Sequence, residues 1–213
     1  MSAAARFITF EGVEGVGKST QVAALSAALS RRGIAHVVTR EPGGTPLAEK
    51  IRALLLEAVQ ETLPASAELL LMFAARAVHL ANRIEPELHS GRWVLCDRFT
   101  DATYAYQGAG RALGAKIVAT LESFIQGDRR PDLTVLLDLP IAKALERAHL
   151  RNPGAAPDRF EAERADFFGR VRDAYLARAK EYPQRCVLID ADRPATQVAG
   201  AVLAAVESRQ WIS

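Results

Sequence analysis

Between Phe7 and Thr20 the chain reads FITFEGVEGVGKST. The first four of these residues are apolar or β-branched and typical of a buried strand, whereas Val22, Leu25 and Leu29 farther along lie at helical spacing. Residues 12–19 connect the two segments and fit the pattern G-x-x-x-x-G-K-S. This pattern between a strand and a helix predicts a loop that wraps around phosphate groups.

Each residue type in this loop has a mechanical reason. Gly12 and Gly17 allow backbone angles and close approaches that a Cβ atom would block. Backbone N–H groups and the start of the following helix then point at an anion. Lys18 would neutralise the transferred phosphate, and the Ser19 hydroxyl would be a ligand of Mg²⁺. We therefore predict ATP binding by Gly12, Val13, Glu14, Gly15, Val16, Gly17, Lys18, Ser19 and Thr20.

Short apolar runs alternate with longer helical stretches along the whole chain. Strands are predicted at residues 6–11, 35–39, 93–96, 133–137 and 186–189. Helices are predicted at residues 18–32, 47–60, 65–89, 115–126, 141–150, 161–181 and 194–208. Such alternation is typical of an α/β fold, in which helices cover both faces of a parallel sheet. We expect a three-layer P-loop NTPase fold with a five-stranded parallel sheet, as a single domain spanning residues 1–213.

Composition and charge exclude several classes of protein. The chain has 213 residues, of which 49% are hydrophobic and 24% charged, as in an ordinary globular protein. Because no apolar run approaches the roughly 20 residues that cross a bilayer, we expect no membrane association. The net charge of +2 gives no sign of nucleic-acid binding. Cys96 and Cys186 lie in apolar segments, which predicts reduced thiols and a cytoplasmic location.

An acidic residue at the end of a neighbouring strand is needed to organise Mg²⁺. Asp97 follows the strand predicted at 93–96, and Asp138 follows the one at 133–137. We favour Asp97 as the metal ligand, because Arg98 comes directly after it and would offer a cation for phosphate. Asp138 stays open as the alternative, although it is also placed to cap the next helix.

Arginines are frequent at the predicted loops, namely Arg40, Arg98, Arg111, Arg147, Arg151 and Arg159. Transfer of a phosphoryl group between two phosphorylated molecules needs fixed positive charges, because the donor and the acceptor repel each other. The sequence contains no Asn-Lys-x-Asp segment, which a guanine-nucleotide switch would use to read its base. The pattern therefore favours a small-molecule kinase over a switch protein.

A flexible lid is predicted at about residues 148–160. Residues 151–158 read RNPGAAPD, and their two prolines and one glycine would end a helix. Arg147 and Arg151 are four residues apart on one helix face before this break, and Arg159 follows it. We expect these arginines to close over the transferring phosphate and to exclude water.

Further motifs accompany the phosphate loop: TREPGG at 39–44, FAAR at 73–76, DRF at 97–99, AYQG at 105–108 and DRFE at 158–161. Together with FEGVEGVGKS at 10–19, they resemble the bacterial thymidylate kinases over nearly the whole chain. The resemblance implies Mg²⁺-dependent phosphoryl transfer from ATP to thymidylate (dTMP), which gives dTDP and ADP. It also implies a homodimer formed through helices beside the sheet.

The resemblance assigns two residues to the thymine ring. Phe73 would stack on the ring, a contact that contributes about 1–3 kcal/mol in single-strand binding. Arg76, three residues farther along the same helix face, would donate to a thymine carbonyl. Without the resemblance we would interpret Phe73 as a core residue.

The other roles implied by the resemblance concern the sugar and the phosphates. They are Glu14 at the sugar 3′-hydroxyl, Arg98 on the acceptor phosphate with Arg40 nearby, Tyr106 against the deoxyribose and Gln107 beside it. The chain departs from the family at Ala102, where a serine is usual, and Thr103 next to it becomes the predicted partner of the base edge. The phosphate loop itself contains no arginine. The chain therefore resembles the subtype with lid arginines, and the predicted catalytic set is Lys18, Arg98, Arg147, Arg151 and Arg159.

Two other functions stay open at this point. One is a P-loop kinase with a different acceptor, which would prefer AMP, GMP or a small metabolite to dTMP. The other is a nucleotide-dependent interaction or switch protein, which would hydrolyse ATP slowly and show no stimulation by an acceptor.

Overall fold

The structure, a computed structural model, describes residues 4–57, 61–151, 159–160 and 163–212. Its centre is a five-stranded sheet with the order β2-β3-β1-β4-β5, in which every neighbouring pair is parallel. The strands are β1 (Phe7–Glu11), β2 (His36–Arg40), β3 (Trp93–Asp97), β4 (Leu133–Asp138) and β5 (Cys186–Asp190). The predicted α/β fold is therefore confirmed.

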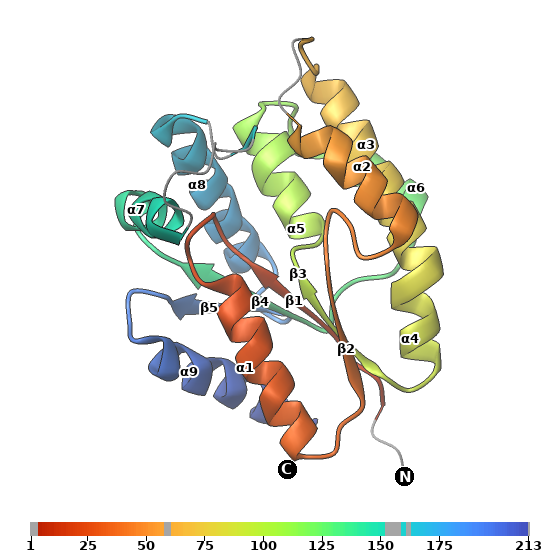
Figure 1. The fold of residues 1–213 in the computed structure, drawn as a ribbon, viewed down its shortest axis with the longest axis vertical. Helices are drawn as coiled ribbons and strands as arrows, with labels where there is room; N and C mark the ends of the chain where they lie inside the picture. The colour runs from red at the N-terminus through yellow and green to blue at the C-terminus, as the bar shows by residue number, and fades with distance from the viewer. Residues whose placement is uncertain (1–3, 58–60, 152–158, 161–162, 213) are drawn as a thin grey trace.

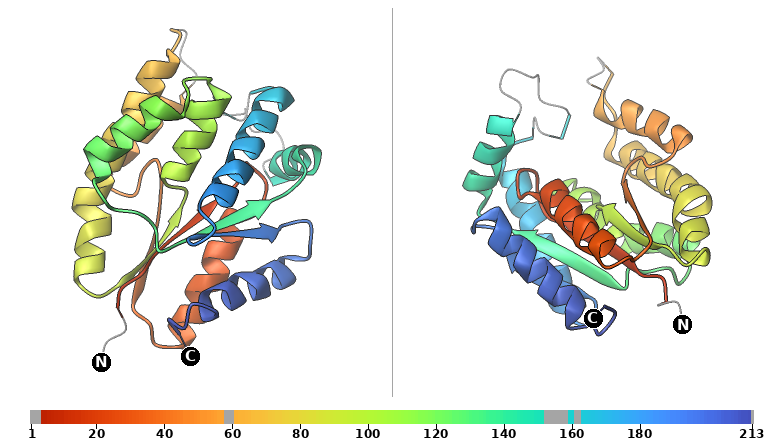
Figure 2. Two further views of the ribbon diagram at one scale, coloured as in Figure 1. Left: turned by 180° about the vertical axis from the view of Figure 1, so that it is seen from behind. Right: turned by 60° about the horizontal axis from the view of Figure 1, so that its bottom comes forward.

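Helices cover both faces of the sheet, as the views in Figures 1 and 2 show. On one face, α1 (Lys18–Arg31) packs against α9 (Ala195–Glu207). The other face carries α3 (Ala65–His79), η1 (Leu80–Ile84), α4 (Glu85–His89), α5 (Thr100–Thr103), η2 (Tyr104–Gly110), α6 (Ala115–Gln126) and α8 (Ala165–Glu181). Two more helices lie beside these, α2 (Pro46–Leu56) against α3 and α7 (Ile141–Arg151) against α8.

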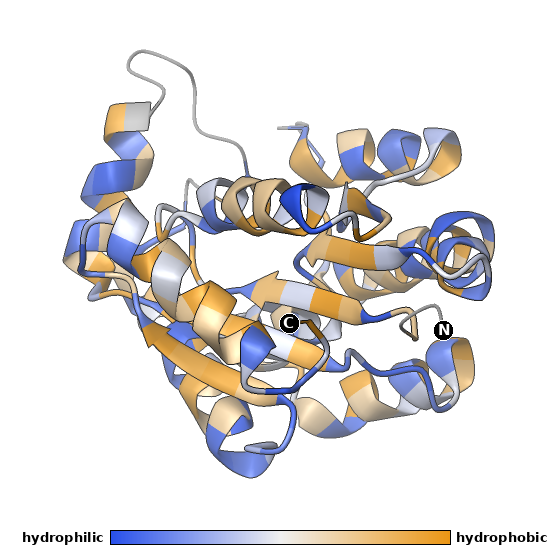
Figure 3. Ribbon diagram, turned by 90° about the horizontal axis from the view of Figure 1, so that it is seen from below, coloured by the Kyte–Doolittle hydropathy of each residue, from blue (hydrophilic) through white to orange (hydrophobic). Residues whose placement is uncertain are grey.

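The core is formed where the inner strands meet the helices. All five residues of β1 are buried, and β3 and β4 are buried except at their last residues. Figure 3 shows the strands largely in hydrophobic colours between helices that carry hydrophilic residues. Strands covered on both sides are apolar along their whole length, which is why these runs were recognisable in the sequence.

The helix predicted at 65–89 is confirmed as one continuous helical segment, in which the π-helical turn η1 connects α3 with α4. The helix predicted at 47–60 ends earlier, because Glu57 takes an extended conformation after α2. The helix predicted at 161–181 begins at Ala165. Residues 58–60 and 161–162 lie outside the described part of the chain.

The helical segment formed by α5 and η2 was not predicted. Thr100, Thr103, Gly108 and Gly110 are weak helix formers, so local propensity argues against a helix there. Packing decides instead, since η2 lies against α8. At Gly110 a Cβ atom would collide with the Phe167 ring, so only glycine allows this close approach.

Both cysteines are free thiols, with Cys96 buried and Cys186 half-buried. Burial raises the pKa of Cys96 well above its ordinary value, which keeps the thiol protonated. Within the described residues, no helix combines the length and the apolar composition that crossing a membrane requires.

A buried ion cluster ties α5 to α8 and to Arg185, which directly precedes β5. The Asp101 carboxylate, in a residue only 4% exposed, accepts from Arg178 Nε at 2.5 Å and from Arg185 Nη1 and Nη2 at 2.6 and 2.8 Å. Burial alone would raise the pKa of Asp101, but the hydrogen bonds and charge of Arg185, with those of Arg178, lower it. The ionised cluster therefore stabilises the packing of α8 on the sheet.

Replacing Asp101 tests this cluster. We expect Asp101→Asn to lower the free energy of unfolding at neutral pH by about 3–5 kcal/mol, because two arginines would lose their carboxylate. Since the folded-state pKa of Asp101 lies below its unfolded value of about 3.9, its stabilisation is present above that pH and disappears as the pH falls through the folded-state pKa. Urea denaturation between neutral and acidic pH measures both effects.

The matched control is Asp190→Asn, which removes the exposed partner of Arg193 and should change stability little. The account would be contradicted if Asp101→Asn were as stable as this control at neutral pH, or if the deficit of Asp101→Asn did not shrink in acid.

Candidate functional site

The phosphate loop lies at the carboxyl edge of the sheet, between β1 and α1. Gly12 has φ +131° and Gly17 has φ +94°, in the region that favours glycine. A Cβ atom on Gly12 would also overlap the carbonyl oxygen of Leu137, and one on Gly15 that of Ala144 in α7. The positive φ holds for both Gly12 and Gly17, but the close approach holds only for Gly12, because a Cβ atom on Gly17 would meet nothing within 4 Å. Gly15 has an equally strong reason that the motif does not specify.

The Lys18 side chain turns back onto the backbone of the phosphate loop. Its Nζ donates to the carbonyl oxygens of Val13 at 2.8 Å and Gly12 at 3.2 Å, and the residue is only 6% exposed. Burial, followed by the charge of Arg98, lowers its pKa. A buried ammonium inside a ring of backbone groups is poised to bind an anion that replaces these carbonyls.

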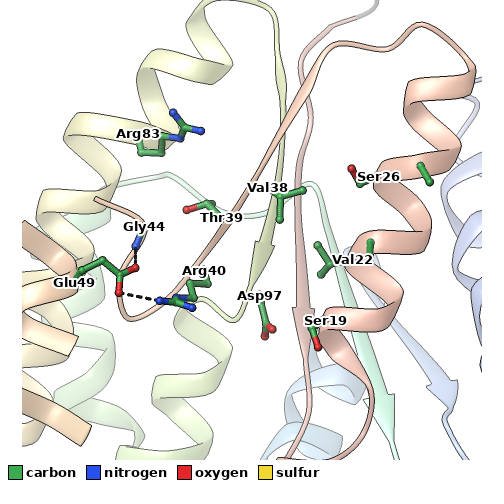
Figure 4. A pocket seen from close by; sticks show the side chains of 12 residues that line it. Ser19, Val22, Ser26, Val38, Thr39, Arg40, Gly44, Glu49, Arg83 and Asp97 are labelled. Atoms are coloured by element: carbon green, nitrogen blue, oxygen red, sulfur yellow. Dashed lines mark hydrogen bonds and ion pairs between the residues drawn. The ribbon is translucent and has the colours of Figure 1, made fainter. Parts of the chain in front are cut away.

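Ser19 and Asp97 come from α1 and from the end of β3, and both face the same opening (Figure 4). Asp97 Oδ1 is buried and has no hydrogen-bond partner. Asp138, the alternative acid, instead accepts from Arg172 Nε at 2.7 Å and Nη2 at 2.8 Å. This bidentate ion pair engages both of its oxygens, so Asp97 fits a cation better.

Two cavities meet beside these residues. The first, which we call the phosphate chamber, has a volume of about 250 Å³. It is lined by Glu14, Gly15, Gly17, Lys18, Ser19, Arg40, Glu41, Arg52, Asp97 and Arg98. The second, the acceptor pocket, has about 60 Å³ and is lined by Glu14, Glu41, Pro42, Arg52, Leu56, Met72, Arg98, Ala102, Tyr106 and Phe160. The shared lining residues make the two cavities neighbours.

Arg98 stands at the boundary between the two cavities. Its Nη1 donates to Gly12 O at 2.8 Å, and its Nη2 donates to Glu14 and to the Tyr106 hydroxyl, the latter at 3.2 Å. The side chain is 13% exposed, so part of the guanidinium remains accessible. The structure thus brings Glu14, Arg98 and Tyr106 together, as the resemblance implied.

Arg76 is held by hydrogen bonds to two side chains, one of which, Glu41, lines the acceptor pocket. Its Nε donates to Glu41 Oε2 at 2.7 Å, and its Nη2 donates to Thr103 Oγ1 at 3.0 Å. His79 Nδ1 lies 2.9 Å from the other Glu41 oxygen. Arg76 Nη1 is buried without a hydrogen-bond partner. Thr103 therefore orients Arg76 in this structure, and one donor of Arg76 is left for another group.

Gln107 presents the complementary atom. Its Nε2 donates to Glu68 Oε1 at 2.7 Å, and because a carboxylate only accepts, the amide nitrogen must face Glu68. The other amide atom, Gln107 Oε1, is buried without a partner. Glu41 and Tyr106 line the acceptor pocket. Arg76 is hydrogen-bonded to Glu41, and Gln107 is the residue after Tyr106.

Phe73 does not line either of these two cavities. It is 2% exposed and belongs to a core cluster with Leu69 and Val118. The Arg76 guanidinium carbon lies 4.9 Å from the centre of its ring. In this structure the Phe73 ring therefore packs against the Arg76 guanidinium.

The predicted phosphate-binding arginines outside the loop are spread apart. Arg40 lines the phosphate chamber and donates to Glu49 at 2.9 Å (Figure 4). Arg147 Nη1 donates to Ala191 O at 3.0 Å, and Arg159 is paired with Glu68 at 2.6 Å. The side chain of Arg151 and residues 152–158 of the predicted lid lie outside what the structure describes. The described lid arginines, Arg147 and Arg159, are thus not gathered at the phosphate chamber.

Two residues of the site were missed in the sequence. Arg52 lines both cavities and donates to Pro42 O at 2.9 Å. Its spacing from Ala48 and Leu55, which places all three on one face of α2, was the available signal. Glu41 lies within the TREPGG motif, yet its position between Arg76 and His79 could not be read from the motif. Burial would raise the pKa of Glu41, but the Arg76 charge and the His79 hydrogen bond lower it.

Comparisons with known proteins identify the family of this chain. The profile of the thymidylate kinase family matches residues 10–202. The thymidylate kinase of Chromohalobacter salexigens is 58% identical over 205 residues, which is 96% of each chain. That of Alkalilimnicola ehrlichii is 53% identical over 98% of this chain and 96% of its own.

A solved structure is similar as well. The crystal structure of thymidylate kinase from Ehrlichia chaffeensis superimposes with a TM-score of 0.77 at 32% identity, covering 95% of this chain and 99% of that one. With a matching family profile and relatives of this similarity over nearly its full length, the chain belongs to the thymidylate kinase family.

Proposed function

We propose that this protein transfers the terminal phosphoryl group of ATP to dTMP and so produces dTDP and ADP. Within the site, the observation that carries the choice of acceptor is the pair of buried, unpartnered atoms Arg76 Nη1 and Gln107 Oε1. One is a hydrogen-bond donor and the other an acceptor. Buried polar atoms without partners are costly, which suggests that a ligand satisfies both.

The edge of thymine has the matching pattern. Its O4 carbonyl accepts a hydrogen bond, as Arg76 Nη1 requires, and its N3–H donates one, as Gln107 Oε1 requires. Cytosine presents an amino group and an unprotonated ring nitrogen at the same two places. A donor would then face the donor Arg76 Nη1, and an acceptor would face the acceptor Gln107 Oε1. A site that must satisfy buried polar atoms discriminates strongly against such an analogue.

The phosphates would meet in the phosphate chamber. Lys18 and the loop N–H groups would hold the ATP phosphates, and Arg98, with Arg40 beside it, would hold the phosphate of dTMP. The unpartnered Asp97 Oδ1 and the Ser19 hydroxyl fit Mg²⁺, which would neutralise the phosphate charge when bound. Direct attack by the dTMP phosphate oxygen needs no covalent enzyme intermediate, so the residues only position and neutralise.

The remaining roles follow the same assignment. Tyr106 would pack against the deoxyribose and Glu14 would accept from its 3′-hydroxyl, since both line the acceptor pocket. Arg147, Arg151 and Arg159 would act from a lid at about residues 148–160 within the single domain. Because Arg159 is paired with Glu68 in this structure, the lid would have to move for Arg159 to reach the phosphates.

A homodimer is part of this proposal, and exposed apolar side chains on one flank of the molecule support it. Leu47 and Leu54 of α2, Leu70 of α3 and Phe124 of α6 are between 54% and 81% exposed. Helix α3 contacts both α2 and α6, so the three helices form one flank (Figure 1). Clustered exposed apolar residues mark association surfaces, and most soluble oligomers are symmetric homo-oligomers.

We also propose a cytoplasmic location without nucleic-acid or membrane partners. Free nucleotides are its substrates under this function, and the free thiols of Cys96 and Cys186 suit a reducing compartment.

A panel of monophosphates tests the function directly. With ATP and Mg²⁺, we expect dTMP to be phosphorylated with a kcat/KM about 10⁴-fold above that for dCMP, because cytosine leaves both buried atoms unsatisfied. Omission of Mg²⁺ should abolish turnover. A preference for AMP or GMP, or ATP hydrolysis that no monophosphate stimulates, would overturn the proposal.

The dimer is tested by one charge on its proposed surface. Phe124→Glu should convert a dimer into a monomer in light scattering, because a carboxylate would have to be buried at the interface. Leu188→Glu is the control, since this exposed leucine lies on β5, away from that flank. A wild-type chain that is monomeric at micromolar concentration would contradict the proposed dimer.

A further inference from the structure

Arg98 has an unusual backbone conformation. Its φ is +71°, a region that residues other than glycine rarely adopt and that costs roughly 1–2 kcal/mol. Such a conformation persists only where the surroundings fix it. Here the Arg98 N–H donates to Phe10 O at 2.9 Å, and the N–H of the next residue, Phe99, donates to Glu11 Oε1 at 2.7 Å. Glu11 thus fixes the turn through the backbone N–H of the residue that follows Arg98.

The Arg98 side chain is guided by a second group from far along the chain. Tyr175 of α8 is 3% exposed, and its hydroxyl accepts from Arg98 Nη1 at 3.2 Å. The same hydroxyl donates to Glu11 Oε2 at 2.8 Å. Burial, and then the charge of Glu11, raise the pKa of Tyr175, so the hydroxyl keeps the proton that it donates.

The Glu11 side chain therefore supports both the backbone and the guanidinium of Arg98. Glu11 Oε1 holds the backbone through Phe99, and Glu11 Oε2 holds the side chain through Tyr175. Glu11 is completely buried at the end of β1, and the hydrogen bonds from Phe99 and Tyr175 engage both of its carboxyl oxygens. Burial, with the Asp101 charge, raises the pKa of Glu11, whereas the Arg98 charge and the hydrogen bonds from Tyr175 and Phe99 favour its ionised form and lower that pKa.

We propose that Glu11 and Tyr175 are positioning residues that aim the Arg98 guanidinium at the acceptor phosphate. The inference rests on the proposed function, in which Arg98 binds the phosphate of dTMP. Neither residue lines the phosphate chamber or the acceptor pocket, so neither touches the nucleotide there and both act through Arg98. Since Tyr175 belongs to α8, the aim of Arg98 depends on the packing of that helix.

The test separates the phosphate from the rest of the nucleotide. Titration calorimetry would compare dTMP with thymidine, which lacks the phosphate, for wild type and Tyr175→Phe. We expect Tyr175→Phe to weaken dTMP about tenfold, as loss of a hydrogen bond to a charged group does, and to leave thymidine and ATP affinity unchanged. A merely structural role would weaken dTMP and thymidine equally.

The matched control is Tyr104→Phe. Tyr104 donates to Glu122 Oε2 at 2.6 Å, so this substitution removes a tyrosine–carboxylate bond away from Arg98 and should leave dTMP affinity unchanged. A second variant, Glu11→Gln, keeps an acceptor for Phe99 but not for Tyr175, and it should show the same loss restricted to dTMP. If Tyr175→Phe does not fold, Glu11→Gln decides alone.

Equal losses for dTMP and thymidine, or unchanged dTMP affinity in folded Tyr175→Phe or Glu11→Gln, would overturn the proposal. Failure of the proposed function would instead be visible in the wild type, which would then not bind dTMP.

Discussion

The repulsion between two phosphate groups is the constraint on which this structure depends. A protein that brings them together must keep cations inside a partly buried cavity, where unpaired charges are costly. Under the proposed function Lys18 and Arg98 are these cations, and in this structure backbone carbonyls and Glu14 partner them. Both cations therefore have hydrogen-bond partners and are not left buried and unpaired.

The sheet supplies the rigid frame for this arrangement. Phe10 pairs with Asp97 in the parallel register of β1 and β3, so the residues that follow each strand emerge side by side. The phosphate loop follows one strand and Arg98 follows the other. Buried acidic side chains support this edge: Glu11 accepts from the backbone of the turn at Arg98, and Glu41 accepts from the Arg76 side chain of α3. Ligand sites of parallel α/β sheets lie at the carboxyl ends of the strands for the same reason.

Local patterns in the sequence were sufficient for the sheet, the phosphate loop and most helices. Apolar runs predict strands, and the spacing of Gly12, Gly17, Lys18 and Ser19 predicts the phosphate loop, from only a few neighbouring residues each. By contrast, α5 and η2 form because they pack against α8, which no local propensity indicates. The roles of Glu11 and Tyr175 were invisible for a related reason, since the two residues are 164 positions apart and meet only in the folded chain. The stacking of Phe73 on thymine stays a prediction, since in this structure its ring is 2% exposed and lies against the Arg76 guanidinium.

A crystal structure with dTMP and a non-hydrolysable ATP analogue would measure the central claim most directly. The account predicts the dTMP phosphate against the Arg98 guanidinium, the ATP phosphates against Lys18, and the two reacting atoms about 3–3.5 Å apart. A complex in which dTMP binds with its phosphate away from Arg98, or in which the two phosphates occupy separate cavities, would contradict it.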